Sequence, residues 1–436
     1  MHSPSLLDFT LARSVGQDYS IKQLMKGNIL VLTVSRIIWS MSMSVVNPYQ
    51  PLFIQALGGS KPMIGLITAL GSATGMIFYP LGGYLADKSG RAKLVGYATL
   101  LYAMSFIVFI MAPTWQWVAV AISFQQLVLF YMPALNAIMA DSIPPGARGR
   151  ILSLTIAIPE AVRILAPFIG GWLIETYTLI PAMRLGYMLS FGMAFLVAVM
   201  RIRYLRETIE KQEFRWDIPK IVRESYSNVW ESVKWILANM RGYSLIAMML
   251  IFIASLVQPF WVVYATEVTG LTPLQWGQLS LIAGAAKVAI SLMVGGLVDR
   301  LGPRKSMVVS LLIGAPAMLA FPYAKGFVAL TLVYVVLVLG NAFIWISSGV
   351  YLANSIPRAV RGRIMAGLGQ GVSLGVSGGG YAQGFILFLP GMIGSIVSGF
   401  IYEVNPMYPW YLNAAVMVLC LLMVLRLMRE PSKAEV

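Results

Sequence analysis

Apolar runs separated by short polar segments make up most of this chain. Each run is long enough for a helix, at about 1.5 Å per residue, to cross about 30 Å of hydrocarbon. The pattern therefore predicts an all-α membrane protein with twelve transmembrane helices. The expected spans are 28–57, 63–86, 94–112, 116–140, 151–175, 181–201, 244–267, 274–298, 304–323, 327–352, 362–402 and 407–427.

Basic residues gather in every second connection between these runs. They are Lys88, Arg91 and Lys93, then Arg148 and Arg150, the segment 201–241, Arg300, Arg304 and Lys305, Arg358, Arg361 and Arg363, and finally Arg426, Arg429 and Lys433. The intervening connections contain only Lys61, Arg184 and Lys325. By the positive-inside rule, we expect a multi-pass protein of the plasma membrane with both termini in the cytoplasm.

Composition agrees with a membrane protein and excludes other classes. Of the 436 residues, 58% are hydrophobic and 11% are charged, against roughly a quarter charged in soluble domains. The net charge of +15 follows from topology, so we expect the lipid bilayer and no nucleic acid as a partner. One cysteine, Cys420, and one histidine, His2, predict no metal site, and we expect no cofactor.

The chain divides into two halves around a charged segment. We expect a cytoplasmic tail over 1–27, a six-helix bundle over 28–201, a basic amphipathic linker over 202–243, a second six-helix bundle over 244–428 and a short tail over 429–436. We expect a monomer.

Two polar motifs recur between the halves. Gly83-Tyr-Leu-Ala-Asp87-Lys-Ser-Gly90-Arg91 returns 212 residues later as Gly295-Gly-Leu-Val-Asp299-Arg-Leu-Gly302-Pro, followed by Arg304. Asp141-Ser-Ile-Pro-Pro-Gly-Ala-Arg148-Gly-Arg150 returns 213 residues later as Asn354-Ser-Ile-Pro-Arg-Ala-Val-Arg361-Gly-Arg363. Pro48 in the first span has a weaker counterpart in Pro259. Echoes at nearly one offset indicate a duplicated six-helix unit.

These paired loops resemble the signature loops of the major facilitator superfamily. The resemblance implies two pseudo-symmetric bundles and a secondary active transporter that works by alternating access, and not an enzyme. It implies a cytoplasmic gate built from Gly83, Asp87, Gly90, Arg91, Asp141, Arg148, Arg150, Gly295, Asp299, Arg300, Gly302, Arg304, Arg361 and Arg363.

Within this gate we expect two ion pairs, Asp87 with Arg363 and Asp299 with Arg150, that latch the cytoplasmic side when the site faces outward. We also expect Gly83 and Gly90 to flank a tight reversal, through positive φ and close helix approach. The alternative is that these charges only end the helices and fix topology.

Four ionisable residues fall within the expected spans, namely Arg36, Glu160, Arg163 and Lys287. Each is costly there, so each is expected to face a wet cavity or a partner. Counting along the helices places all four about 12 to 20 Å from the cytoplasmic ends. Glu160 is the natural protonation site, which would couple protons to a solute. Alternatively, Glu160 and Arg163 form an inert ion pair, and Lys287 or Arg36 snorkels to the surface or pairs with backbone carbonyls.

Polar and aromatic side chains in the spans are further candidates for a substrate or proton site. They are Gln125, Gln126, Gln258, Trp261, Tyr264, Asn341 and Trp345. The alternative for each aromatic ring is helix packing or an interfacial position. Apolar walls with few polar groups suit binding of varied small molecules.

Two substrate classes remain open. Ala166-Pro167-Phe-Ile-Gly170-Gly171 resembles the span-five motif of drug and proton antiporters, although Ala166 stands where glycine is usual and span four lacks their arginine. That resemblance implies proton-coupled efflux of amphipathic compounds. The excess of cations over carboxylate within the spans favours uptake or exchange of an organic anion. No phosphate-binding loop for ATP is present, and a non-transporting receptor or scaffold is a remote alternative.

Span eleven departs from the internal repeat. It is about fifteen residues longer than its counterpart and carries Gly367, Gly369, Gly371, Gly375, Gly378, Gly379, Gly380 and Gly384. Each glycine costs a helix roughly 1 kcal/mol relative to alanine. We therefore expect a broken or hinged helix that lines the cavity. The alternative is close packing of helices through small residues.

Overall fold

The computed structural model describes residues 25–88, 90–144, 148–209, 217–357, 360–376 and 384–429. Those residues form helices and connecting segments without any strand. Twelve helices or helix pairs are long and apolar enough to cross a membrane. The expected all-α class and number of spans are therefore confirmed.

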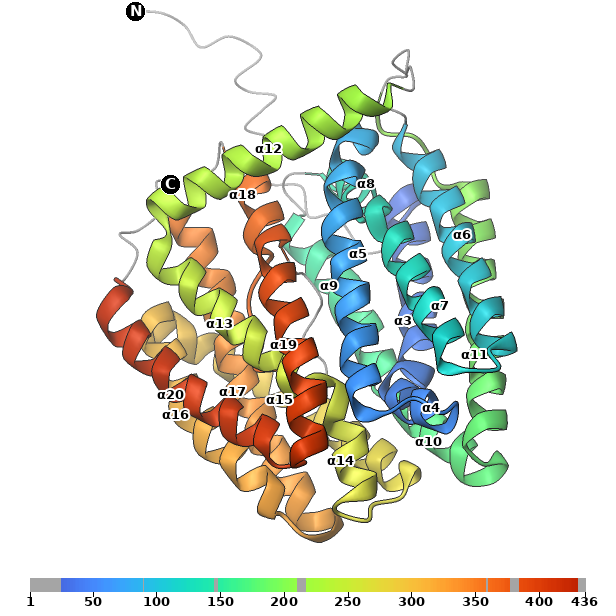
Figure 1. Ribbon diagram of the computed structural model, residues 1–436. Helices are drawn as coiled ribbons and strands as arrows, with labels where there is room; N and C mark the ends of the chain where they lie inside the picture. The colour runs from blue at the N-terminus through green and yellow to red at the C-terminus, as the bar shows by residue number, and fades with distance from the viewer. Residues whose placement is uncertain are drawn as a thin grey trace, which may run out of the picture.

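The N-terminal half forms one bundle, drawn from blue to green in Figure 1. Proline residues explain the breaks within its spans, since each removes a backbone donor. Pro48 lies in a 3₁₀ segment of the first span, Pro133 follows one in the fourth, and Pro159 lies within α9. The elements are α3 (Gly27–Val46), η1 (Asn47–Tyr49), α4 (Gln50–Ala56), α5 (Lys61–Lys88), α6 (Arg91–Met111), α7 (Trp115–Val128), η2 (Leu129–Tyr131), α8 (Met132–Ser142), α9 (Arg148–Arg163), α10 (Ala166–Tyr177) and α11 (Leu179–Tyr204).

The C-terminal half forms a second bundle beside it, drawn from yellow to red (Figure 1). Pro259 sits in a 3₁₀ segment of its first span, which matches the place of Pro48 in the other half. The elements are α13 (Arg241–Val257), η4 (Gln258–Phe260), α14 (Trp261–Glu267), α15 (Pro273–Leu301), α16 (Pro303–Ala320), η5 (Phe321–Tyr323), α17 (Gly326–Ser355), α18 (Arg361–Leu368), α19 (Phe385–Val404) and α20 (Tyr408–Leu427).

Span eleven is broken, as the glycine pattern predicts. Helix α18 ends at Leu368 and α19 begins at Phe385. The two ends nevertheless meet, because a Cβ added to Gly384 would lie 2.1 Å from the carbonyl oxygen of Gly367. Gly384, at the start of α19, therefore lies directly beside the end of α18.

Helix α12 (Ile218–Asn239) crosses one end of both bundles (Figure 1). It begins with Asp217, whose side chain accepts a hydrogen bond from the Lys220 amide at 3.1 Å. The Tyr226 hydroxyl donates to the carbonyl oxygen of Ile77 in α5 at 2.5 Å. Pro80 lies in the same stretch of α5 and removes the backbone donor for the carbonyl of Met76.

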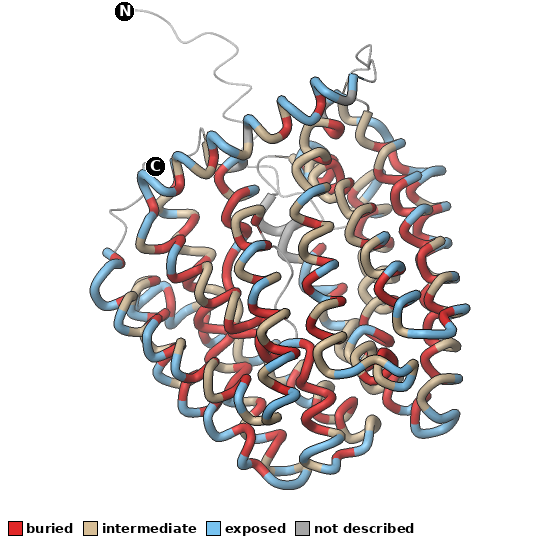
Figure 2. Tube along the Cα trace, in the orientation of Figure 1, coloured by how far each residue is buried: buried red, intermediate tan, exposed pale blue. Residues whose placement is uncertain are grey.

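Large apolar side chains cover the outer surface of the spans, as expected where lipid is the solvent. Met293 and Leu332 are 71% and 63% exposed, and exposed positions line the outer helices in Figure 2. The predicted linker over 202–243 contains α12, whose exposed Trp230 is also apolar. Residues 210–216 of this linker lie outside the described residues.

Candidate functional site

A cavity of about 2350 Å³ lies between the two bundles. Its lining begins at Pro48 and Gln50 in the first span. It extends to Lys88 and Arg363, which lie beside α12. We call the end of the bundles that carries Lys88 and α12 the basic end. The cavity therefore reaches the basic end from the middle of the spans.

The opposite end of the cavity is sealed by backbone contact between the halves. A Cβ on Gly65 of α5 would lie 2.3 Å from the carbonyl oxygen of Ser395 in α19. The Tyr49 hydroxyl lies 2.6 Å from the carbonyl oxygen of Pro167 and 3.1 Å from that of Pro273 in the other half. Glu267 forms an ion pair with Lys61 across the same boundary. This conformation is therefore closed at the opposite end and open toward the basic end.

Three of the four predicted intramembrane charges meet in the cavity wall. The Glu160 carboxylate accepts hydrogen bonds from Arg163 Nη2 at 2.7 Å and from Lys287 Nζ at 3.4 Å. Glu160 and Arg163 belong to α9 and Lys287 belongs to α15, so the second ion pair links the halves. Their side chains are 29% to 40% exposed. The cluster is thus open to whatever fills the cavity.

Arg36 takes a different place. Its Nη1 donates to the carbonyl oxygen of Thr155 at 3.4 Å, and Arg36 is absent from the cavity lining. Arg36 was expected to face the cavity or a partner, or to pair with backbone carbonyls, and in this conformation it makes the carbonyl contact. It lies behind the wall, where a helix carbonyl replaces water as the acceptor.

The sequence gives little sign of a second buried arginine, Arg201. This residue is 3% exposed, although it ends an apolar run in the manner of an ordinary topology charge. Its Nη1 donates to Thr99 Oγ1 at 2.8 Å, and its guanidinium carbon lies 5.7 Å from the Trp39 ring and 5.9 Å from the Tyr131 ring. In the described part of the chain it forms no salt bridge. Hydroxyls and aromatic faces stabilise this charge instead.

The predicted polar and aromatic residues separate into two groups. Gln125, Gln126, Gln258 and Trp345 line the cavity. Tyr264 does not: it is fully buried and donates to the carbonyl oxygen of Pro322 at 3.0 Å. The prediction that Tyr264 belongs to the substrate site is therefore wrong in this conformation. Its ring packs between helices, which was the alternative.

Asn341 and Trp261 line the cavity, but their polar atoms form hydrogen bonds with the non-helical segment that follows α18. Asn341 Oδ1 accepts from the Leu374 amide at 2.9 Å and from Ser373 Oγ at 2.8 Å. Trp261 Nε1 donates to the carbonyl oxygen of Gly375 at 2.7 Å. We call residues 369–376 the span-eleven loop. Its backbone lacks helical partners, so these side chains satisfy groups that hydrocarbon could not.

Replacing Asn341 with leucine should loosen this loop. The change removes the acceptor of the Leu374 amide, and an unsatisfied buried amide costs about 1 to 3 kcal/mol. Hydrogen exchange at 371–376 should accelerate by roughly 5- to 150-fold. Thr331→Val on the same helix is the control, because Thr331 bonds only to Phe327 within α17. Unchanged exchange in Asn341→Leu would contradict the fastening role.

Several gate residues bind helix ends or one another at the basic end. Arg91 Nη1 lies 2.5 Å from Asp141 Oδ2. Arg361 Nη2 donates to the carbonyl oxygens of Ala353 and Ile356 at the end of α17. Arg304 Nη2 donates to the carbonyl oxygen of Leu425 at 2.6 Å. These contacts tie neighbouring helices within a half, and cations suit helix carboxyl ends.

The expected glycine roles hold in part. Gly90 has a φ of 89°, so it makes the predicted reversal before α6, and its counterpart Gly302 has a φ of 84° before α16. A Cβ on Gly83 or Gly295 would meet nothing within 4 Å. The predicted close helix approach at Gly83 is therefore wrong in this conformation, since the halves are apart at the basic end.

The predicted latch pairs remain predictions. Arg363 Nη1 lies 3.0 Å from Glu231 Oε2 of α12, and both side chains are largely exposed, so this contact contributes little stability. Asp299 and Arg300 are exposed at the end of α15. The side chains of Asp87, Arg148 and Arg150 lie outside the described residues.

Known proteins share this architecture. The peptide transporter POT, solved with sulfate, aligns with a TM-score of 0.68 at 16% identity, over 97% of this chain and 98% of that one. A bacterial homologue of the human lysosomal transporter Spinster, in an inward-facing and unoccupied conformation, aligns with a TM-score of 0.64 at 15% identity, over 91% and 94%. At these identities the likeness concerns the fold alone.

Sequence relatives include two named for drug resistance. The chain is 23% identical over 291 residues to the multi-drug resistance efflux pump PmrA of Streptococcus pneumoniae, covering 65% of this chain and 70% of that protein. It is 21% identical over 419 residues to multidrug resistance protein 2 of Bacillus subtilis, covering 94% and 95%. The family model for the Major Facilitator Superfamily matches residues 32–380 and 243–436. This twelve-span chain, with its two bundles around one cavity, belongs to the Major Facilitator Superfamily.

Proposed function

We propose that this membrane transporter exports amphipathic small molecules by alternating access, driven by protons that enter through Glu160. One observation carries the proposal: Glu160, a carboxylate in the cavity wall, binds cations from both halves of the protein. Among the described residues that line the cavity, Glu224 is the other carboxylate, and it lies on α12 at the basic end. Glu160 is therefore the acid group placed to sense both substrate and conformation.

The geometry supports a simple coupling scheme. While Glu160 is ionised, it attracts Lys287 of the other half at 3.4 Å. Protonation removes that charge and weakens the link, because an ion pair needs both charges. A substrate that binds beside the cluster also competes for Arg163 or Lys287. Proton and substrate thus act on the same contact between halves, as coupled transport requires.

Orientation and location follow from charge. The basic end carries Lys88, Arg91, Arg300 and Arg304 at the ends of α5 and α15 and the starts of the helices that follow them. The positive-inside rule favours the cytoplasm for this end. The cavity would then face inward, where an exporter loads its substrate. The plasma membrane is the proposed location, and the names of the two drug-resistance relatives support an efflux direction.

Uptake or exchange of an organic anion is the second candidate. The cluster holds two cations and one carboxylate, Arg163, Lys287 and Glu160, which leaves one positive charge for a carboxylate or phosphate. Proton flux in proteoliposomes tests both candidates. Movement of protons across the vesicle membrane in exchange for a lipophilic cation would support export. Flux with organic anions only would favour the second candidate, and no proton flux with either class would overturn proton coupling.

A further inference from the structure

Two glutamine side chains in the cavity wall are exposed within otherwise buried stretches. Gln258 is the one exposed residue between Ile253 and Ala265, and Gln370 is the one exposed residue from Gly367 through Val376. Both line the cavity. Because both are exposed at the cavity lining, the two amides border whatever fills the cavity.

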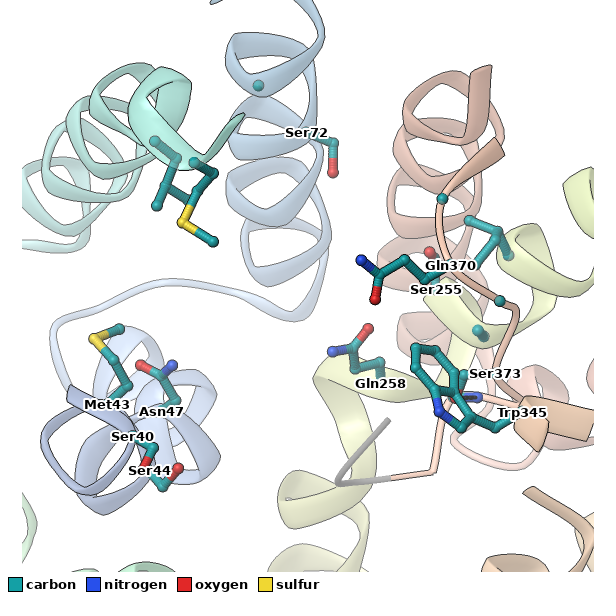
Figure 3. Close-up of a pocket in the computed structure, with 18 of the residues that line it drawn as sticks. Ser40, Met43, Ser44, Asn47, Ser72, Ser255, Gln258, Trp345, Gln370 and Ser373 are labelled. Atoms are coloured by element: carbon teal, nitrogen blue, oxygen red, sulfur yellow. Dashed lines mark hydrogen bonds between the residues drawn. The ribbon is translucent and has the colours of Figure 1, made fainter. Parts of the chain in front are cut away.

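The two amides converge from different elements. Gln258 begins η4 in the seventh span, and Gln370 belongs to the span-eleven loop. In Figure 3 both side chains project into the same open space, beside the indole ring of Trp345. Ser72 of α5 lies across that space in the other half. Gln258, Gln370 and Trp345 themselves carry no charge.

The backbone that carries Gln370 is held in one conformation. Val372, Leu374 and Val376 alternate along the loop, and all three are buried in the C-terminal half. The Val372 amide donates to Ser348 Oγ at 3.0 Å, in addition to the contacts of Asn341 and Trp261 described above. Such anchoring lowers the entropy that a binding group loses on contact with its ligand. The loop therefore presents Gln370 in a fixed position.

We propose that Gln258, Gln370 and Trp345 form an uncharged subsite for a neutral, planar group that bears both hydrogen-bond donors and acceptors, such as a carboxamide on an aromatic ring. Each glutamine amide supplies two donors and an acceptor, and the indole ring offers a flat apolar surface. A site without charges rejects ions, because their water would not be replaced. The proposal rests on the proposed function, since it describes part of the transported molecule.

Binding of benzamide to the full-length protein in lipid nanodiscs tests this subsite. Saturation-transfer NMR would compare benzamide with benzoate, which adds a charge, and with N,N-dimethylbenzamide, which lacks the donors; empty nanodiscs give the baseline. Benzamide should bind tightest. Gln370→Leu and Gln258→Leu should each weaken benzamide by about three- to tenfold, as expected for one lost hydrogen bond. Gln116→Leu, at an exposed position outside the cavity lining, should not.

A second variant distinguishes loss of the subsite from a general loss of folding. Gln370→Glu keeps the side-chain shape but replaces the amide donors with a carboxylate. It should reverse the preference, so that benzamidinium binds more tightly than benzamide. Equal binding of benzamide and N,N-dimethylbenzamide to the wild type, or an unaltered preference in Gln370→Glu, would overturn the subsite.

These binding measurements need no proton gradient and no transport. Benzamide selectivity without substrate-driven proton flux would therefore reject the proposed function and keep the subsite. Proton flux without benzamide selectivity would reject the subsite and keep the proposed function.

Discussion

Substrate-driven proton flux should fall to roughly one per cent or less of the wild-type rate when Glu160 is replaced by glutamine, because the amide cannot take up a proton at this depth. The amide also cannot neutralise Arg163 and Lys287, which lie 2.7 and 3.4 Å from the native carboxylate. The measurement is internal pH in proteoliposomes after addition of a lipophilic cation that the wild type transports.

The matched control is Glu175→Gln. Glu175 lies in α10, the helix that follows α9 in the same span, and is exposed at the opposite end. Its loss removes a carboxylate from the span without touching the cluster, so proton flux should match the wild type. If Glu160→Gln also retained its flux, the ion pair of Glu160 with Arg163 would be structural, and protons would enter elsewhere.

Gly65→Ala should open the seal at the opposite end and stop transport. The added Cβ would lie 2.3 Å from the Ser395 carbonyl oxygen and 3.0 Å from the Gly399 amide nitrogen, and backbone atoms cannot move aside as a side chain can. Overpacking of this kind costs about 1 to 3 kcal/mol, which shifts a two-state equilibrium by roughly 5- to 150-fold. Spin labels on Ser60 and Glu403, with Cys420 replaced by alanine, should report a longer distance across this end.

Gly83→Ala provides the comparison on the same helix. A Cβ at Gly83 meets nothing within 4 Å in this conformation, so the distance between the labels should stay at its wild-type value. Both changes replace glycine by alanine in α5 and alter helix propensity alike. A distance that is equally unaffected in both variants would show that the seal tolerates a methyl group and would refute its role.

The features that the sequence predicted correctly depend on residues that lie close together along the chain. The number of spans and the arrangement in two bundles are confirmed, because apolar length sets the spans wherever the helices pack. The 3₁₀ segments at Pro48 and Pro259 were not predicted, although they too have a local cause in the missing backbone donor. Local reasoning did predict the break in span eleven, because glycines weaken a helix locally.

Contacts between segments far apart in the sequence could not be predicted from local patterns. Tyr264 looked like a cavity residue but lies in the aromatic core, and Arg36 bonds to a carbonyl behind the wall. Arg201 looked like a topology charge but is buried between two rings. Helix periodicity places a side chain on a face, and only the neighbouring helices determine what that face meets.

The sequence by itself determined that this protein is a twelve-span membrane protein with two related halves and a carboxylate within the bilayer, since these features depend on composition and spacing along the chain. Only the tertiary structure decided that Glu160 joins Lys287 across the halves, that Asn341 and Trp261 hold the span-eleven loop, and that Gln258 and Gln370 share one space. These relations connect residues far apart in sequence, and they are set by packing between helices, which apolar periodicity does not encode.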